Sequence, residues 1–136
     1  MKNKFLDLWN KYFSEAELPV IFYYTDDDGG AEWVEKREGH SCIICDLGKV
    51  RNGKSLVFNA ERVKCGGARR NLGYTDQMRP GFEYFLSCGN DRMEGERYLR
   101  TPELVREFMN NQQTIPGAGR NIVFKRWDKM AENDIP

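Results

Sequence analysis

Three short runs of β-branched and aromatic residues punctuate the chain, at 19–25, 54–59 and 121–127. Each run is too short for an ordinary helix and has a glycine, proline or acidic residue at one end or both. Residues of this kind are enriched in strands, because their branched or flat side chains pack well on a pleated surface. The sequence therefore predicts at least three strands, the first near the amino end of the chain and the last near its carboxyl end.

Segments with the apolar spacing of an amphipathic helix lie around these runs. The large rings of the first segment share one helical stripe, for which packing into the core is the ordinary role. Thr101 is followed by Pro102, and this pair favours a helix start. The Thr101 hydroxyl can accept a hydrogen bond from a backbone N–H of the first turn, and Pro102 has no backbone N–H that would remain unpaired there. The helices predicted in this way cover 2–13, 41–51 and 102–111, with Ser41 as the expected N-cap of the second.

The 136 residues are enough for one well-filled core and too few for two. We expect a single domain over 1–136 with an α+β fold, in which a small mixed sheet of at least three strands is covered by amphipathic helices. A shorter apolar run over 82–86 predicts a further helix packed on the sheet. The charged segment 31–39 predicts a turn of helix or an irregular surface connection.

The charges of the chain are balanced, with 21 Lys and Arg against 21 Asp and Glu. This balance argues against a general nucleic-acid binder, which uses a uniformly basic field. Asp7 and Lys11 interrupt the apolar residues of the amino end, so the sequence shows neither a secretory signal nor a membrane-spanning segment. We therefore expect a cytoplasmic protein whose partners include neither nucleic acid nor a membrane.

The four cysteines form the strongest candidate site in the sequence. Reducing conditions in the cytoplasm favour thiols, metal ligands or redox groups over disulfides. A C-x2-C pair presents two thiolates to one ion, and each of the two later cysteines is followed by glycine, whose backbone N–H can approach a ligand closely. The sequence predicts a zinc or iron–sulfur site formed by Cys42, Cys45, Cys65 and Cys88.

Two other interpretations of the cysteines remain open at this point. They can be small buried residues of the core, because cysteine is among the most buried residue types. Cys42 and Cys45 can also form a redox pair at a helix start, although Ile43 and Ile44 between them favour burial over an exposed turn. The one histidine of the chain, His40, is either a fourth ligand or a general base or, more commonly, a surface residue.

The segment after Cys65 offers a second kind of site. Gly66 and Gly67 leave the backbone open, and Arg69 and Arg70 add two guanidinium groups that can bind phosphate or carboxylate. The segment matches no established phosphate-loop pattern, and a turn followed by a solvated basic pair has the same sequence. The alternative function is therefore a pocket for a small anionic metabolite, with the cysteines serving only the structure.

Several stretches of the chain together resemble the domain of unknown function family 169 (DUF169). The matching segments are 40–42, 49–60, 65–67, 72–74, 82–87, 95–98, 101–105 and 123–127. The family is found in bacteria and archaea and has no assigned reaction, and its pattern carries cysteine at the positions of Cys42 and Cys65. Its members are roughly twice as long, so the resemblance implies an amino-terminal half that would self-associate or pair with a missing carboxyl-terminal half.

Overall fold

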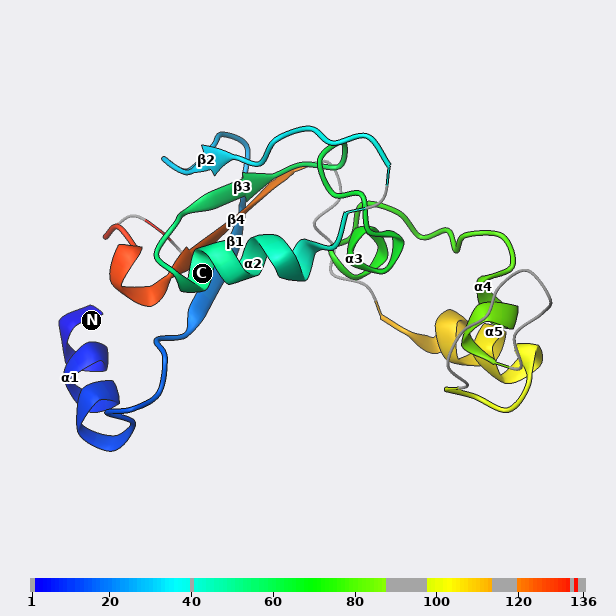
Figure 1. The fold of residues 1–136 in the computed structure, drawn as a ribbon, viewed down its shortest axis with the longest axis horizontal. Coiled ribbons are helices and arrows are strands. Elements are labelled where there is room, and N and C mark those ends of the chain that lie inside the picture. The colour runs from blue at the N-terminus through cyan, green and yellow to red at the C-terminus, as the bar shows by residue number, and fades with distance from the viewer. Residues whose placement is uncertain (1, 40, 88–97, 114–119, 133, 135–136) are drawn as a thin grey trace.

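A computed structural model describes residues 2–39, 41–87, 98–113, 120–132 and 134 of the chain. In chain order, the elements are α1 (Lys2–Tyr12), β1 (Val20–Thr25), β2 (Glu32–Trp33), α2 (Ile43–Arg51), β3 (Leu56–Phe58), α3 (Gly66–Asn71), α4 (Phe82–Leu86), α5 (Pro102–Asn111), β4 (Asn121–Arg126) and the 3₁₀ helix η1 (Trp127–Lys129). Figure 1 shows an elongated molecule with the sheet and α2 at its centre and other helices toward both ends.

The four strands form one mixed sheet in the order β1-β4-β3-β2. β4 pairs antiparallel with β1, where Val20 lies opposite Arg126, and antiparallel with β3, where Val57 lies opposite Val123. β2 and β3 run parallel. The expected α+β fold and all three predicted strands are confirmed. The last strand of the chain, β4, therefore lies in the sheet between two strands from the amino-terminal half, β1 and β3.

β2 was not predicted. Glu32 and Trp33 lie in a segment expected to be a helical turn or an irregular connection, yet they pair with Leu56 and Val57 of β3. Both β2 residues are exposed, so this segment lacks the alternation of apolar and polar residues by which a half-buried strand is recognised in a sequence. The backbone hydrogen bonds from Glu32 N to Ser55 O and from Val34 N to Val57 O hold this edge of the sheet.

The core lies between the sheet and α2. Ile122 of β4 and Val50 of α2 are fully buried, and α2 packs against β4. Burying one such side chain contributes about 1.5–3 kcal/mol to the free energy of folding. The buried members of this cluster come from both layers and from the segments beside them: Val34, Val50, Leu56, Phe58, Val63, Ile122 and Phe124.

The helices at the two ends of the molecule do not cover the sheet as expected (Figure 1). No residue of α1 is buried, and the helix docks mainly through Phe5, whose ring centroid lies 4.0 Å from that of Trp127 in η1. The aromatic stripe of this helix is therefore a surface stack and not part of the core. α4, expected on the sheet, packs instead against α5, where Arg106 lies 3.6 Å from Glu83.

The start of α5 agrees with its sequence signature. Thr101 has an extended backbone, and its Oγ1 accepts a hydrogen bond from Leu104 N at 3.3 Å. Pro102 occupies the first turn, where its missing N–H costs nothing. The apolar spacing of this helix predicted one buried face, of Leu104, Val105, Phe108 and Met109. Val105 and Met109 are buried, whereas Leu104 and Phe108 are exposed, so the predicted face is buried only in part.

Candidate functional site

The C-x2-C pair lies in the first turn of α2. Cys42, and not the expected Ser41, is the N-cap residue, and its side chain makes no capping hydrogen bond. Cys45 N donates to Cys42 O at 3.2 Å. Both side chains are exposed and neither is in a disulfide. The interpretation of these two cysteines as small buried core residues is therefore wrong.

The two isoleucines between the cysteines have different environments. Ile43 packs against the core cluster, whereas Ile44 is 66% exposed. The burial expected of both residues is found only for Ile43. The pair therefore does lie in an exposed turn at a helix start, which is the setting that suits a metal-binding or redox pair.

Cys65 has the same local conformation on a different helix. It is the N-cap of α3, with φ −78° and ψ 120° against −83° and 124° for Cys42, and it is a half-buried free thiol. Within the described parts of the chain, no three His, Cys, Asp or Glu residues form a group that could hold a metal ion. Cys88 and His40 lie outside the described residues, so the four-thiolate site stays a prediction.

The glycine-rich segment after Cys65 is the helix α3 and not a turn. Gly66 and Gly67 are exposed, and a Cβ atom added to either would meet no described heavy atom within 4 Å. Alanine would fit at both positions. The structure therefore gives no steric reason for glycine here.

The two arginines of α3 bind backbone carbonyls of neighbouring segments. Arg69 Nη1 donates to Ala60 O at 2.8 Å, and Arg70 Nη2 donates to Met109 O at 2.7 Å, while Arg70 Nη1 donates to Asp76 O. An anion at this segment would compete with these carbonyls for the guanidinium donors. Arg70 also joins α3 to the end of α5, a structural role that the sequence pattern did not indicate.

A hollow of about 120 Å³ lies between β2 and α2. Its wall includes Asp46, which is only 2% exposed. Arg37 Nη2 donates to Asp46 Oδ1 at 3.0 Å, Arg37 Nη1 to Oδ2 at 3.4 Å, and Lys49 Nζ to Oδ1 at 2.8 Å. Burial alone would raise the pKa of Asp46, but these hydrogen bonds and the two positive charges outweigh it and lower the pKa. Asp46 is therefore a buried carboxylate held by two cations.

Sequence reasoning missed this cluster. Lys49 is three residues beyond Asp46 on α2, a spacing at which side chains meet on a helix. This spacing was the available signal. Arg37 comes from the segment after β2, whose position follows only from the unpredicted pairing of β2 with β3.

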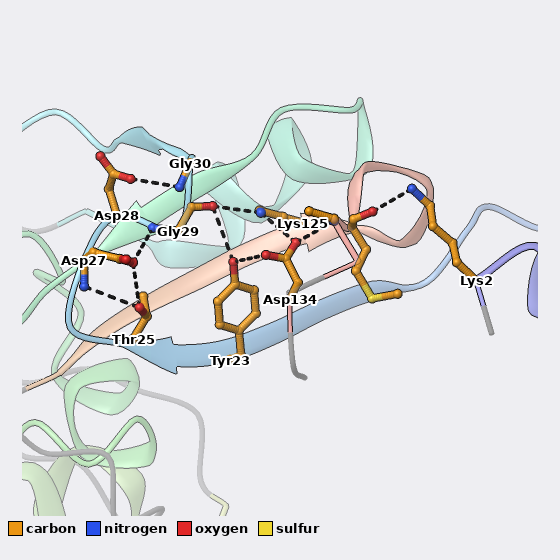
Figure 2. A network of polar contacts seen from close by, with 11 residues as sticks. Lys2, Tyr23, Thr25, Asp27, Asp28, Gly29, Gly30, Lys125 and Asp134 are labelled. Atoms are coloured by element: carbon orange, nitrogen blue, oxygen red, sulfur yellow. Dashed lines mark hydrogen bonds and ion pairs between the residues drawn. The ribbon is translucent and has the colours of Figure 1, made fainter.

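A second buried polar cluster lies on the sheet face opposite α2 (Figure 2). Tyr23 Oη donates to Asp134 Oδ1 at 2.7 Å, and Lys125 Nζ donates to Asp134 Oδ2 at 2.7 Å and to Gly29 O at 2.8 Å. Gly29 has a φ of +57°, and a Cβ on it would lie 2.6 Å from Tyr23 Oη. Glycine is thus required where this loop crosses the sheet. Each of these groups has a protein partner, so the cluster is structural.

None of the helices in the described ranges has the length and apolar character needed to cross a membrane.

The sequence profile of the DUF169 family, described as Uncharacterised ArCR, matches residues 13–136. This span includes every element of the fold except α1. No curated protein and no solved structure matches the chain. With nearly all of its length matched, the chain belongs to the DUF169 family.

Proposed function

We propose that this chain binds zinc or an iron–sulfur cluster through Cys42, Cys45, Cys65 and Cys88. The observation that carries the proposal is the exposure of Cys42 and Cys45 in one turn at the start of α2. Cysteine is normally among the most buried residue types, so two exposed thiols in one turn favour a chemical role over a packing role.

The electrostatic setting of this turn favours thiolates. The first turn of a helix carries partial positive charge on its unpaired N–H groups, which stabilises an anionic ligand there. These N–H groups would offset part of the negative charge that thiolate ligands bring to a metal.

Completing the site requires ligands beyond this turn. Two thiolates leave half of a tetrahedral zinc shell open, and the candidates are Cys65 on α3 and Cys88. Ile43 of α2 and Ala68 of α3 pack against the same core cluster, so the first turns of both helices contact one core. Metal binding would then draw the two helix starts together and stabilise the fold, because the energy of binding is coupled to folding.

The alternative, a pocket for a small anionic metabolite at Gly66, Gly67, Arg69 and Arg70, has weaker support. The Cβ positions of the two glycines face open space. Both arginines, however, already donate to carbonyls of the chain. The thiol proposal is preferred because the exposed thiols have no competing partner of this kind among the described residues.

The test is metal analysis and visible absorbance of protein purified without oxygen, before and after incubation with zinc or with iron and sulfide. We expect one metal centre per chain in the natural sequence. Cys42→Ser and Cys45→Ser should each lose it, whereas the neighbouring change Ser41→Ala should not. Metal content that is absent from the natural chain, or that is unchanged in both cysteine variants, would overturn the proposal.

A further inference from the structure

The hollow between β2 and α2 has the features of a binding site that is independent of the thiols. Trp33 forms part of its wall, and the guanidinium of Arg62 lies 4.9 Å from the centre of the Trp33 ring. Lys54 and Glu32 are paired at 3.1 Å, and both side chains are mostly exposed. The space of about 120 Å³ admits a ligand of only a few non-hydrogen atoms.

Two cations of this hollow share one counter-charge. Arg37 and Lys49 both bind the single carboxylate of Asp46. Their side chains are 33% and 50% exposed, which leaves part of each cation accessible. Among the residues that the structure describes, neither cation has a second acceptor. Arginine has five N–H donors and lysine three, so both retain donors for a ligand.

The remaining charges around the hollow restrict the kind of anion. Glu35 is exposed and lines it together with the paired Glu32, so a strongly charged anion is repelled where it enters. The three acids and three bases that line the hollow balance, so a singly charged ligand suits it better than a multiply charged one. Arg37 already shows on Asp46 the two-nitrogen geometry that suits a carboxylate. Inorganic phosphate carries more negative charge near neutral pH and fits this balance less well.

From these observations we infer that the hollow between β2 and α2 binds a small monocarboxylate, with Arg37 and Lys49 holding its oxygens and Trp33 in contact with its apolar part. This site uses neither arginine of α3 and none of the cysteines. It therefore differs from the anion pocket expected from the sequence and does not depend on the metal proposal.

The experiment is a titration of the full chain with acetate, at constant ionic strength, followed by two-dimensional NMR. Trp33→Phe identifies the indole N–H signal of Trp33. We expect this signal and the backbone amide of Lys49 to shift with one saturating curve and a dissociation constant of about 1 mM, the range for a ligand of so few atoms. The double variant Cys42→Ser/Cys45→Ser should bind acetate as the natural chain does.

Lys49→Gln removes one charged donor but leaves Arg37 on Asp46, and it should weaken acetate binding about tenfold. Lys49→Arg keeps the charge and should retain binding. The matched control is Lys36→Gln, because Lys36 is an exposed lysine that pairs with Glu61 outside the hollow. A shift that does not saturate, equal weakening by Lys36→Gln and Lys49→Gln, or tighter binding of inorganic phosphate than of acetate would each overturn the inference.

Discussion

Lys125 and Asp134 form an ion pair at 2.7 Å whose side chains are only 6% and 9% exposed. The pair joins the segment after η1 to the centre of the sheet, because Lys125 belongs to β4. Asp134 also accepts hydrogen bonds from Tyr23 of β1 and from the backbone N–H of Ala131. The carboxylate thus accepts hydrogen bonds from three parts of the chain (Figure 2).

Asp134→Asn should destabilise the fold by about 3 kcal/mol, because it leaves the buried ammonium of Lys125 without its counter-charge. The matched control is Asp26→Asn, since Asp26 pairs with Arg120 at 3.2 Å on the exposed surface and should cost less than about 1 kcal/mol. Urea unfolding measures both values. Equal effects of the two changes would contradict the structural role given to Asp134.

Acid should weaken the fold by protonating the carboxylates of Asp134 and Asp46. Burial tends to raise the pKa of Asp134, but hydrogen bonds from Lys125, Tyr23 and Ala131 outweigh it and lower the pKa, as happens for Asp46. A carboxylate with a lowered pKa in the folded state stabilises that state above its unfolded pKa of about 3.9, and the contribution is lost as the pH falls below that value. Urea midpoints measured from pH 7 to pH 3 should fall, and Asp134→Asn should flatten the curve.

Tyr74 should remain protonated to a higher pH than an ordinary tyrosine. Burial, together with repulsion from Tyr24, raises the pKa of Tyr74 to about 12, and its hydroxyl donates to Arg120 O at 2.9 Å. Its contribution to stability is present below pH 10 and is lost as the pH rises through the folded pKa. Ultraviolet titration of the natural chain and of Tyr74→Phe should differ by one tyrosine that ionises near pH 12. A difference centred near pH 10 would contradict this environment.

Thr101→Ala should cost about 1 kcal/mol of stability, because the Oγ1 that caps α5 is lost. Thr101→Ser keeps the acceptor and should restore most of that energy. The denaturation midpoint reports both changes, and an alanine variant as stable as the natural chain would show that the cap contributes nothing.

The sequence predicted the elements that carry a strong periodic pattern or an end signal. The three runs of β-branched and aromatic residues became β1, β3 and β4, and the Thr101–Pro102 signature placed the start of α5 correctly. These predictions succeed because the pattern and the structure have the same physical cause, which is burial of one face or capping of one end.

The elements that the sequence did not predict depend on distant contacts. β2 has two exposed residues and exists through its pairing with β3, and α3 begins with two glycines that are poor helix formers. The stripe of α1 had the right period, but this helix docks on the segment 127–130, through Phe5 on Trp127 and Lys2 on Met130, and none of its residues is buried. The environment of Asp46 was missed for the same reason, because Arg37 reaches it from another segment.

The most direct test of the account is a cobalt titration of reduced protein under anaerobic conditions, because the visible spectrum of Co²⁺ reports both its geometry and its thiolate ligands. The account predicts one Co²⁺ per chain with a tetrahedral, thiolate-rich spectrum, displaced by zinc and lost in Cys42→Ser and Cys45→Ser. Cys65→Ser should reduce the thiolate absorption. A spectrum that remains that of free Co²⁺ throughout the titration would contradict the account.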